Sequence, residues 1–286
     1  MARVAEQDLA LAKLYEGHTD ALAILAEIEN SAVFPANALW SVWAADSPAE
    51  RLQISSSPGE MAVINGSKPW CSGAEYVEYA LCTAWRDAEG PYLVAVALDQ
   101  SGVSIDSRRW NAVGMALSGT CDVRFEQATA FVVGSPGAYL DRPGFWHGAA
   151  GIAACWYGGA IGLAKSLWQQ ALTRASPFVD AHLGAIDVAL AHTGALLRET
   201  AVAIDLSPSN DSRALALRCR ASAEATALTV LNHVGQALGA TPFCRDRQFA
   251  RLAADLPVFI RQSHADRDLA ALATTLKEQN RVPWRL

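Results

Sequence analysis

The chain has 286 residues, of which 51% are hydrophobic and 18% are charged. This composition supplies enough apolar surface for one large or two ordinary domains, and it excludes intrinsic disorder, which needs low hydrophobicity and high net charge. With 23 basic and 29 acidic residues the formal net charge is −6. We therefore expect no overall electrostatic attraction to nucleic acid or to anionic lipid.

Cysteine usage and the N-terminal sequence predict a cytoplasmic protein without a metal site. The six cysteines form no Cys-x-x-Cys pair, and no histidine cluster accompanies them at zinc-site spacing. Scattered cysteines are typical of buried thiols in a reducing compartment. Acidic residues near the start occupy the place of a signal peptide's apolar run. Residues 148–164 carry no charge, but the stretch is shorter than a bilayer requires, so a buried helix is expected and no membrane partner.

The first half of the chain predicts one helix followed by a β-domain. Apolar residues recur at helical spacing over about residues 4–29. From Trp40 to Val133 the sequence is β-like, and Asn65-Gly66 is the strongest hairpin-turn signal in it. Cys121 to Phe125 alternates apolar and charged residues. Short strands separated by turn signals predict a small barrel or sandwich.

The second half predicts a helical bundle. A Gly/Pro-rich connection covers residues 134–143. After it, four helices are expected at about 147–174, 181–205, 212–234 and 245–276, and their short links favour an up-down four-helix bundle. The predicted fold is therefore α+β, with an N-terminal helical segment (1–36), a middle β-domain (37–143) and the bundle (144–286).

Three segments, taken in order, resemble the acyl-CoA dehydrogenase family. Residues 64–74 contain Asn65-Gly66, Lys68 and Trp70-Cys71-Ser72, similar to the family's Asn-Gly, Lys, Trp-x-Ser/Thr stretch. Residues 110–126 and the glycine-rich 158–164 follow at the family's places. The similarity covers about residues 4–272. It implies a flavoprotein with FAD, a small-molecule substrate such as an acyl-CoA, assembly into a homodimer or homotetramer, and an N-terminal segment that is the remnant of a larger helical domain.

The resemblance also implies the cofactor-binding residues. Trp70 and Ser72 match the family's residues beside the flavin ring, where an indole supplies a flat wall and a hydroxyl can bond the ring's polar edge. The alternative, the start of a core strand, is less favoured because the flanking segments also match. Asn232 and Gly235 stand in the family's glycine-rich loop, which approaches the dinucleotide from a neighbouring subunit. A plain helix-ending turn is an equal alternative there.

Several departures leave the catalytic residue unidentified. The family's carboxylate base would fall in Leu256–Ser263, which contains no Glu, or at Ile152. Ala153 stands near the place of an arginine that binds pyrophosphate. His264 is a candidate base, because histidine can take a proton near neutral pH. We favour the alternative that it lies on a solvated helix face among surface ion pairs.

The main functional interpretation is hydride transfer between an acyl-CoA-like substrate and FAD. One alternative is a flavin-dependent monooxygenase of the same fold, and another is a non-catalytic descendant that serves oligomerisation or partner binding. The missing Glu and Arg favour these alternatives. The retained Trp70-Cys71-Ser72 favours a protein that still binds flavin.

Overall fold

The computed structural model describes residues 1–28, 34, 35, 37–45, 51–56, 61–86, 89–278, 282 and 284. The chain forms two compact units. We call the unit made of Lys13–Ala112 and Ala116–Phe145 the barrel unit. We call the unit made of Met1–Ala12, Val113–Met115 and Trp146–Leu286 the helical unit.

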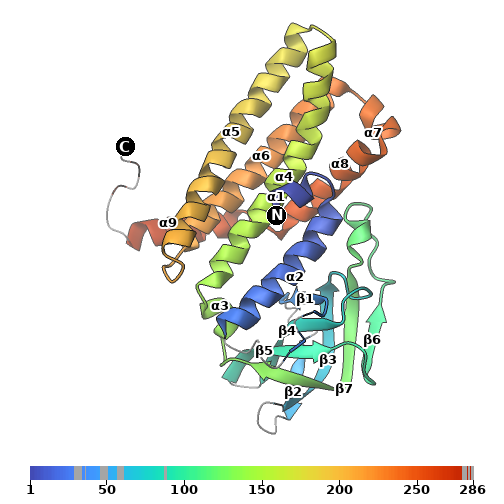
Figure 1. Cartoon of the computed structure of the whole chain (residues 1–286), viewed down its shortest axis with the longest axis vertical. Helices are drawn as coiled ribbons and strands as arrows, with labels where there is room; N and C mark the ends of the chain where they lie inside the picture. Colours follow the sequence, from blue (N-terminus) through green and yellow to red (C-terminus); the bar gives the residue numbers. More distant parts are fainter. Residues whose placement is uncertain are drawn as a thin grey trace. The chain divides into compact units, whose positions relative to one another are not determined.

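The strands of the barrel unit close into a ring. They are β1 (Trp40–Trp43), β2 (Gln53–Ser56), β3 (Met61–Cys71), β4 (Tyr79–Arg86), β5 (Gly90–Ala97), β6 (Val103–Asp106) and β7 (Cys121–Val133). Their order is β1-β4-β2-β3-β7-β5, and β4 also pairs with β5 (Figure 1). Five strands, β4-β2-β3-β7-β5, close the ring, and the short β1 and β6 are the additional strands among the described residues. The predicted small barrel is confirmed.

Side-chain alternation along β7 fills the barrel. Val123 and Phe125 are buried, whereas Asp122 is partly exposed and Arg124 exposed. Because successive side chains of a strand point to opposite faces, this pattern places one face in the core. The alternation expected from the sequence is confirmed. The core also contains buried residues from β1 to β5: Trp43, Ile54, Ile64, Cys82 and Val94.

Asn65-Gly66 is not a hairpin turn, so that prediction is wrong. Both residues lie inside β3, where the register with β7 shifts next to Gly66. Gly66 has a φ of +124°, and a Cβ there would lie 2.6 Å from the carbonyl oxygen of Arg51. The Asn65 amide donates to the Ser55 hydroxyl and its oxygen accepts the Gln127 backbone N–H. The glycine therefore serves an irregularity inside one long strand.

The predicted helix over 4–29 is divided in two. The helices are α1 (Ala2–Ala5) and α2 (Leu9–Glu27), and the predicted last residue, 29, lies outside the described residues. The Asp8 carboxylate accepts the Leu11 backbone N–H at 3.0 Å, which caps the start of α2. The Asp8 side chain therefore offers the backbone a local hydrogen bond in place of a continuous helix, and α2 begins directly after this residue.

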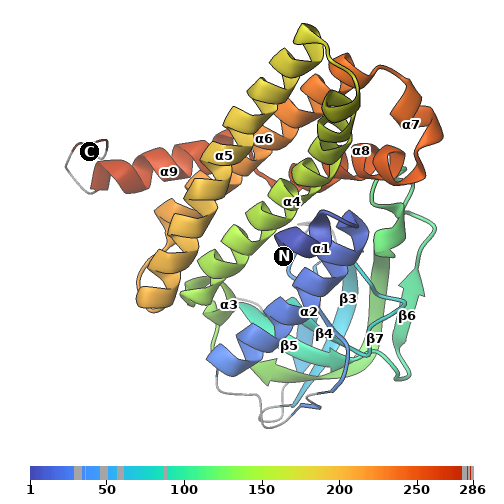
Figure 2. The ribbon, with the colours of Figure 1, turned by 45° about the horizontal axis from the view of Figure 1, so that its top comes forward.

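Within the barrel unit, α2 packs closely on the strands at two glycines, Gly17 of α2 and Gly73 after β3. A Cβ at Gly17 would lie 3.1 Å from the Ser41 hydroxyl on β1. A Cβ at Gly73, just after β3, would lie 2.8 Å from the Leu14 side chain. Ala21, Ile24 and Leu25 of α2 share a core with strand residues. This part of α2 therefore covers β1 and the turn after β3 (Figure 2).

A buried charge cluster joins α2 to α3 (Ala138–Asp141). The Arg142 guanidinium lies 3.3 Å from the Asp20 carboxylate and 2.9 Å from the Glu27 carboxylate. Only 5% of the Arg142 side chain is exposed, so its charge depends on these partners. Burial, reinforced by the negative charge of Glu16, raises the pKa of Asp20 to about 6.

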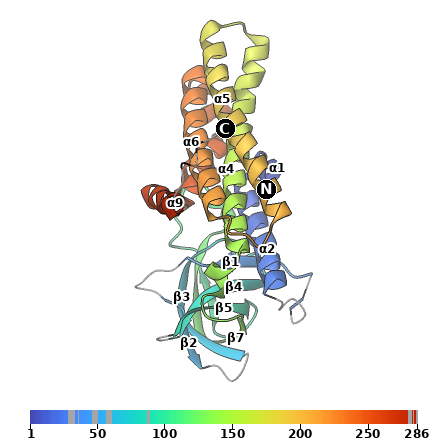
Figure 3. The same cartoon turned by 90° about the vertical axis from the view of Figure 1, so that its left-hand side faces the viewer.

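The helical unit contains the bundle. Its helices are α1, the start of α2, most of α4 (Gly144–Thr173), α5 (Pro177–Leu206), α6 (Arg213–Leu238), α7 (Thr241–Arg245), α8 (Arg247–Phe259) and α9 (Asp266–Glu278), and a 3₁₀ turn covers Ile260–Gln262. Figures 1 and 3 show α4, α5 and α6 side by side. The predicted helices over 147–174 and 181–205 are confirmed within a few residues.

The other two predicted bundle helices need correction. The third continues to Leu238 and ends at Gly239, whose φ is +63°, so Gly235 lies inside the helix. The predicted fourth helix over 245–276 is wrong, because α8 and α9 are separate. Ala265 between them has a φ of +46°, which a continuous helix cannot contain. Figure 2 shows α9 at a steep angle to α5 and α6.

Glycines of α4 allow close packing within the helical unit. A Cβ at Gly158 would lie 2.2 Å from the Ala2 carbonyl oxygen, and one at Gly162 would lie 2.6 Å from the Glu6 carbonyl oxygen. Trp156, on the same helix, is fully buried. The buried helix expected over residues 148–164 is confirmed. None of the helices in the described ranges combines the length and the apolar character needed for a membrane crossing.

Candidate functional site

Trp70 stands at the end of β3 in an unusual conformation. Its φ is +63° and its side chain is 64% exposed. The ring meets Trp110 edge to face, with centroids 5.7 Å apart and an interplanar angle of 85°. A bulky residue in the left-handed region costs about 1–3 kcal/mol, and such strain concentrates at functional sites. The indole of Trp70 is therefore strained and exposed, at the end of β3 and outside the barrel core.

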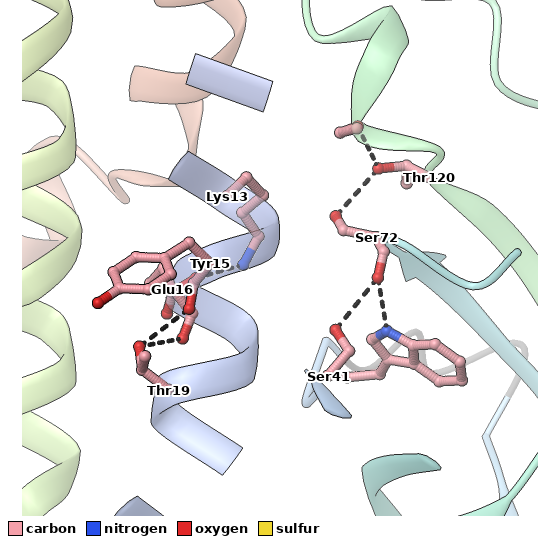
Figure 4. Close-up of polar contacts among 9 residues, drawn as sticks. Lys13, Tyr15, Glu16, Thr19, Ser41, Ser72 and Thr120 are labelled. Atoms are coloured by element: carbon pink, nitrogen blue, oxygen red, sulfur yellow. Dashed lines mark hydrogen bonds and ion pairs between the residues drawn. The ribbon is translucent and has the colours of Figure 1, made fainter. Parts of the chain in front are cut away.

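Ser72 is held by hydrogen bonds on two sides. Its backbone carbonyl accepts the Ser41 hydroxyl at 3.1 Å and the Trp43 indole N–H at 3.0 Å. Its hydroxyl lies 3.0 Å from the Thr120 hydroxyl, which lies 2.7 Å from that of Ser118. Figure 4 shows Ser72 between Ser41 and Thr120. Hydroxyls in such a chain can each donate or accept, so the group can adapt to either kind of partner.

The strand register explains why Ser72 and Thr120 meet. Cys71 and Cys121 are paired in the antiparallel ladder of β3 and β7, so the residues just beyond this pair face each other. The Gly73 backbone N–H also donates to the Ser118 carbonyl at 2.9 Å. Both Ser118 and Thr120 lie in the segment 110–126 that takes part in the resemblance, but the sequence analysis gave neither residue a role. Ser72 and Thr120 meet because β3 pairs with β7, although the two residues lie nearly fifty positions apart in the chain.

The lysine of the same motif has a structural place. Lys68 is 1% exposed, and its ammonium donates to the backbone carbonyl of Thr83 at 2.9 Å and to its hydroxyl. Side chains alternate along β3, so Lys68 points into the barrel. A mostly buried ion pair joins a second lysine, Lys13, to Glu16 on α2 at 2.6 Å. Figure 4 shows this pair beside the group of Ser41, Ser72 and Thr120.

These side chains fit one end of a flavin. An exposed indole face and a hydroxyl chain two residues away match a flat, polar-edged ring. The residues expected for a pyrophosphate do not match. Ala153, near the expected place of the pyrophosphate-binding arginine, is fully buried in the helical unit and carries no charge. Ile152, the second expected position of the carboxylate base, is 8% exposed and is also uncharged. The fit therefore concerns the ring, which is common to FMN and FAD.

Asn232 and Gly235 do not form the expected loop. Both lie within α6, and the Asn232 side-chain oxygen accepts from the Gln236 amide at 3.1 Å, one turn further on. Trp70 and Ser72 belong to the barrel unit, whereas Asn232 and Gly235 belong to the helical unit. The structure thus brings together only the first two, and a cofactor role for the other two stays a prediction.

His264 lies at the exposed edge of an ion-pair group whose other members, Asp268 and Arg220, are mostly buried. Its side chain is 57% exposed, and its Nδ1 is 3.3 Å from the Asp268 carboxylate. Asp268 also lies 3.5 Å from the Arg220 guanidinium and accepts the His264 backbone N–H at 3.2 Å. These contacts are those of the ion-paired alternative. The role of His264 as a base stays a prediction.

Asp255 was missed by the sequence analysis. It lies on α8 directly before the stretch Leu256–Ser263 and is 3% exposed. Its Oδ1 accepts the Met115 backbone N–H at 2.5 Å, and its Oδ2 is buried without a hydrogen-bond partner among the described residues. Burial raises the pKa of this carboxyl. A signal was present, because Asp255 stands within the apolar stripe of Phe249, Leu252, Leu256 and Phe259.

Comparison with known proteins finds similar structures at low sequence identity. No protein-family model matches the chain, and no curated protein sequence matches it. TdsC from Paenibacillus sp. A11-2, in complex with FMN and indole, has a TM-score of 0.82 and 18% identity over 99% of this chain and 82% of its own. Butyryl-CoA dehydrogenase from Megasphaera elsdenii has a TM-score of 0.84 and 14% identity over 96% and 80%. KijD3, in complex with FMN and a dTDP-linked amino-keto sugar, has a TM-score of 0.75 and 18% identity over 99% and 78%.

Proposed function

We propose that this chain, which has the acyl-CoA dehydrogenase fold, binds a flavin at the Trp70 end of β3 and carries out oxidation–reduction on a small molecule. The observation that carries the proposal is the indole of Trp70, exposed and in a left-handed conformation two residues before Ser72. Strain at an exposed aromatic residue contributes nothing to the core. The strained, exposed conformation of Trp70 would be useful if a bound ring stacks on the indole.

Different residues of the barrel unit would make different contacts with the flavin ring. Trp70 supplies a flat apolar wall, and Trp110 supports it edge to face. The Ser72 and Thr120 hydroxyls supply hydrogen bonds to a polar ring edge. Ser41 and Trp43 fix the Ser72 backbone, which keeps the hydroxyl in place. When bound, a flavin ring supplies two-electron chemistry, and the protein contributes position and electrostatics.

The reaction we propose first is hydride transfer between an acyl-CoA-like substrate and FAD. It follows from the family resemblance, and one similar structure is a butyryl-CoA dehydrogenase. The choice of FAD rests on the resemblance alone, since the fitting residues address only the ring. TdsC and KijD3 were both crystallised with FMN, so the identity of the flavin needs its own measurement.

A flavin-dependent monooxygenase is the second candidate, and a specific observation favours it. Removal of an α-proton needs a base, and Leu256–Ser263 contains no Asp or Glu. TdsC, which is similar in structure, is a dibenzothiophene monooxygenase. Oxygenation of a small aromatic substrate would not require the missing carboxylate.

One set of measurements separates these reactions. Flavin released from the purified protein by denaturation should be identified by chromatography as FAD or FMN. Loss of the flavin's visible colour on anaerobic mixing with an acyl-CoA would support dehydrogenation. Oxygen-dependent product formation after external reduction would support the monooxygenase. A protein that neither contains nor takes up either flavin would contradict both and would support the non-catalytic alternative.

We also propose that the chain forms a homodimer or homotetramer through its bundle. The observation behind this is the exposure of three large apolar residues where α4 ends and α5 begins, and of a fourth at the end of α5. Exposed apolar residues that gather in one place are typical of interfaces between proteins. Light scattering after size-exclusion chromatography tests it, and a monomer at micromolar concentration would contradict it. The residues are Trp168, Leu172, Phe178 and Leu206, with exposures of 51%, 64%, 79% and 79%.

A further inference from the structure

Three residues of the long connection between β6 and β7 belong to the helical unit. Val113–Met115 is assigned there, whereas the residues on either side of it belong to the barrel unit. Gly114 lies directly on α8, because a Cβ there would be 2.0 Å from the Ala254 carbonyl oxygen and 2.9 Å from the Val258 side chain. No other amino acid has room at that position. The backbone of this short segment is therefore packed against the helix itself.

Met115 adopts a conformation that needs support. Its φ is +59°, and the residue is 4% exposed. A long side chain in the left-handed region persists only where the surroundings determine it. Asp255 supplies such a determinant, because its Oδ1 accepts the Met115 backbone N–H at 2.5 Å. Hydrogen bonds to a carboxyl group are short and strong when both partners are shielded from water.

We propose that Asp255 is a positioning residue, which holds Met115 in its left-handed conformation and so fixes where the stretch Ala116–Thr120 begins. This stretch follows Met115 directly in the chain and ends at Thr120, whose hydroxyl bonds that of Ser72. Its effect on flavin binding rests on the proposed function. Its effect on the backbone at Met115 does not.

The carboxyl needs its shape and its Oδ1 more than its charge. Oδ2 is buried without a hydrogen-bond partner among the described residues. The nearest cation on α8, Arg251, is paired with the Asp8 carboxylate at 2.6 Å. An isolated buried carboxylate is unfavourable, and burial acts on Asp255 in the direction of the neutral acid. Asparagine has nearly the same shape and keeps a carbonyl oxygen as acceptor.

The test compares Asp255→Asn with Asp255→Ala, and uses the exposed Asp187→Asn on α5 as control. The first readout is amide hydrogen exchange of the peptide containing Met115, on protein without added flavin. We expect Asp255→Ala to exchange at least tenfold faster there, while Asp255→Asn and Asp187→Asn stay within about threefold of the unmodified protein. Exchange that is unchanged in Asp255→Ala would overturn the proposal.

The second readout is the dissociation constant of added FMN or FAD. We expect about a tenfold weakening in Asp255→Ala and rescue by Asp255→Asn to within about threefold. Faster exchange with unchanged flavin affinity would overturn the link to the site. If Asp255→Ala does not fold, Asp255→Asn decides, because loss of protection at Met115 in that folded variant would contradict a role for Oδ1. If the unmodified protein binds no flavin, the proposed function fails, and the exchange data still judge Asp255.

Discussion

Trp70 offers a substitution whose effects on stability and on binding should separate. Replacing it by Gly removes an indole that is 64% exposed. A fully buried aromatic side chain hides about 150–250 Å², so roughly a third of that, about 50–90 Å², is lost here. At about 25 cal/mol per Å² this destabilises the folded state by about 1–2 kcal/mol. The lost edge contact with Trp110 adds about 0.5–1.5 kcal/mol.

The change also releases strain. Glycine adopts a φ of +63° without the penalty of about 1–3 kcal/mol that a bulky residue carries there. The two effects nearly cancel, and the net change in the free energy of unfolding should stay within about 1–2 kcal/mol. Trp40 in the same unit is fully buried and stacks on Tyr79 with centroids 4.8 Å apart. Its replacement by Ala should cost about 3–5 kcal/mol.

Flavin affinity should fall more in Trp70→Gly than in Trp40→Ala, whereas stability should fall more in Trp40→Ala. Loss of an aromatic stacking surface typically costs about 1–3 kcal/mol per ring, which is about 5- to 150-fold in the dissociation constant. Urea unfolding followed by circular dichroism gives the stabilities, and fluorescence titration with FMN and FAD gives the affinities. The reasoning is refuted if Trp70→Gly unfolds as easily as Trp40→Ala while binding flavin as tightly as the unmodified protein.

Three further predictions concern charge, packing and the candidate base. The folded chain holds the Asp20 proton more tightly than the unfolded chain, so this stabilisation is complete below about pH 4 and is lost as the pH rises through about 6. Urea unfolding across pH 4–8 should show this loss in the unmodified protein, and Asp20→Asn, which cannot titrate, should lack it. Gly158→Ala should destabilise by at least about 2 kcal/mol, because its Cβ meets the Ala2 carbonyl at 2.2 Å, whereas Gly184→Ala in open space should stabilise by about 0.5–1 kcal/mol; equal thermal midpoints would contradict this packing. His264→Ala should leave turnover within about twofold, and a loss of 10²-fold or more at unchanged flavin affinity would instead identify a base.

Much of the fold could be predicted because burial imposes a period on the sequence. Val123 and Phe125 alternate with charged residues since one face of β7 is in the core. The Asn65-Gly66 prediction failed for a non-local reason. A positive φ is needed both in a hairpin turn and where a strand passes close to another backbone, and only the Arg51 carbonyl, 2.6 Å from a Cβ at Gly66, distinguishes them.

The C-terminal half shows the same limit. Gly235 reads as a helix break, yet it lies inside α6, where the nearest side-chain atom to an added Cβ is 3.8 Å away. Nothing in the surroundings requires a turn there, so the helix continues to Gly239. The break between α8 and α9 was not expected from the sequence. At this break the Asp268 carboxylate accepts the His264 backbone N–H.

The candidate site was only partly readable. The resemblance pointed to Trp70 and Ser72, but exposure and strain at Trp70 depend on the folded backbone. Thr120 meets Ser72 through the pairing of Cys71 with Cys121. Asp255 bonds a backbone N–H that lies 140 residues earlier in the chain. A backbone partner leaves no residue-type signal, so this contact could not be predicted.

Equilibrium titration of the purified protein with FMN and FAD, followed by visible difference spectra, tests the central claim most directly. The matched pair is Trp70→Leu and Trp168→Leu, since both indoles are exposed, by 64% and 51%, and lie in different units. We predict saturable binding of at least one flavin, weakened about tenfold or more by Trp70→Leu and unchanged by Trp168→Leu. Binding that is absent in the unmodified protein, or equally affected by both substitutions, would contradict the account.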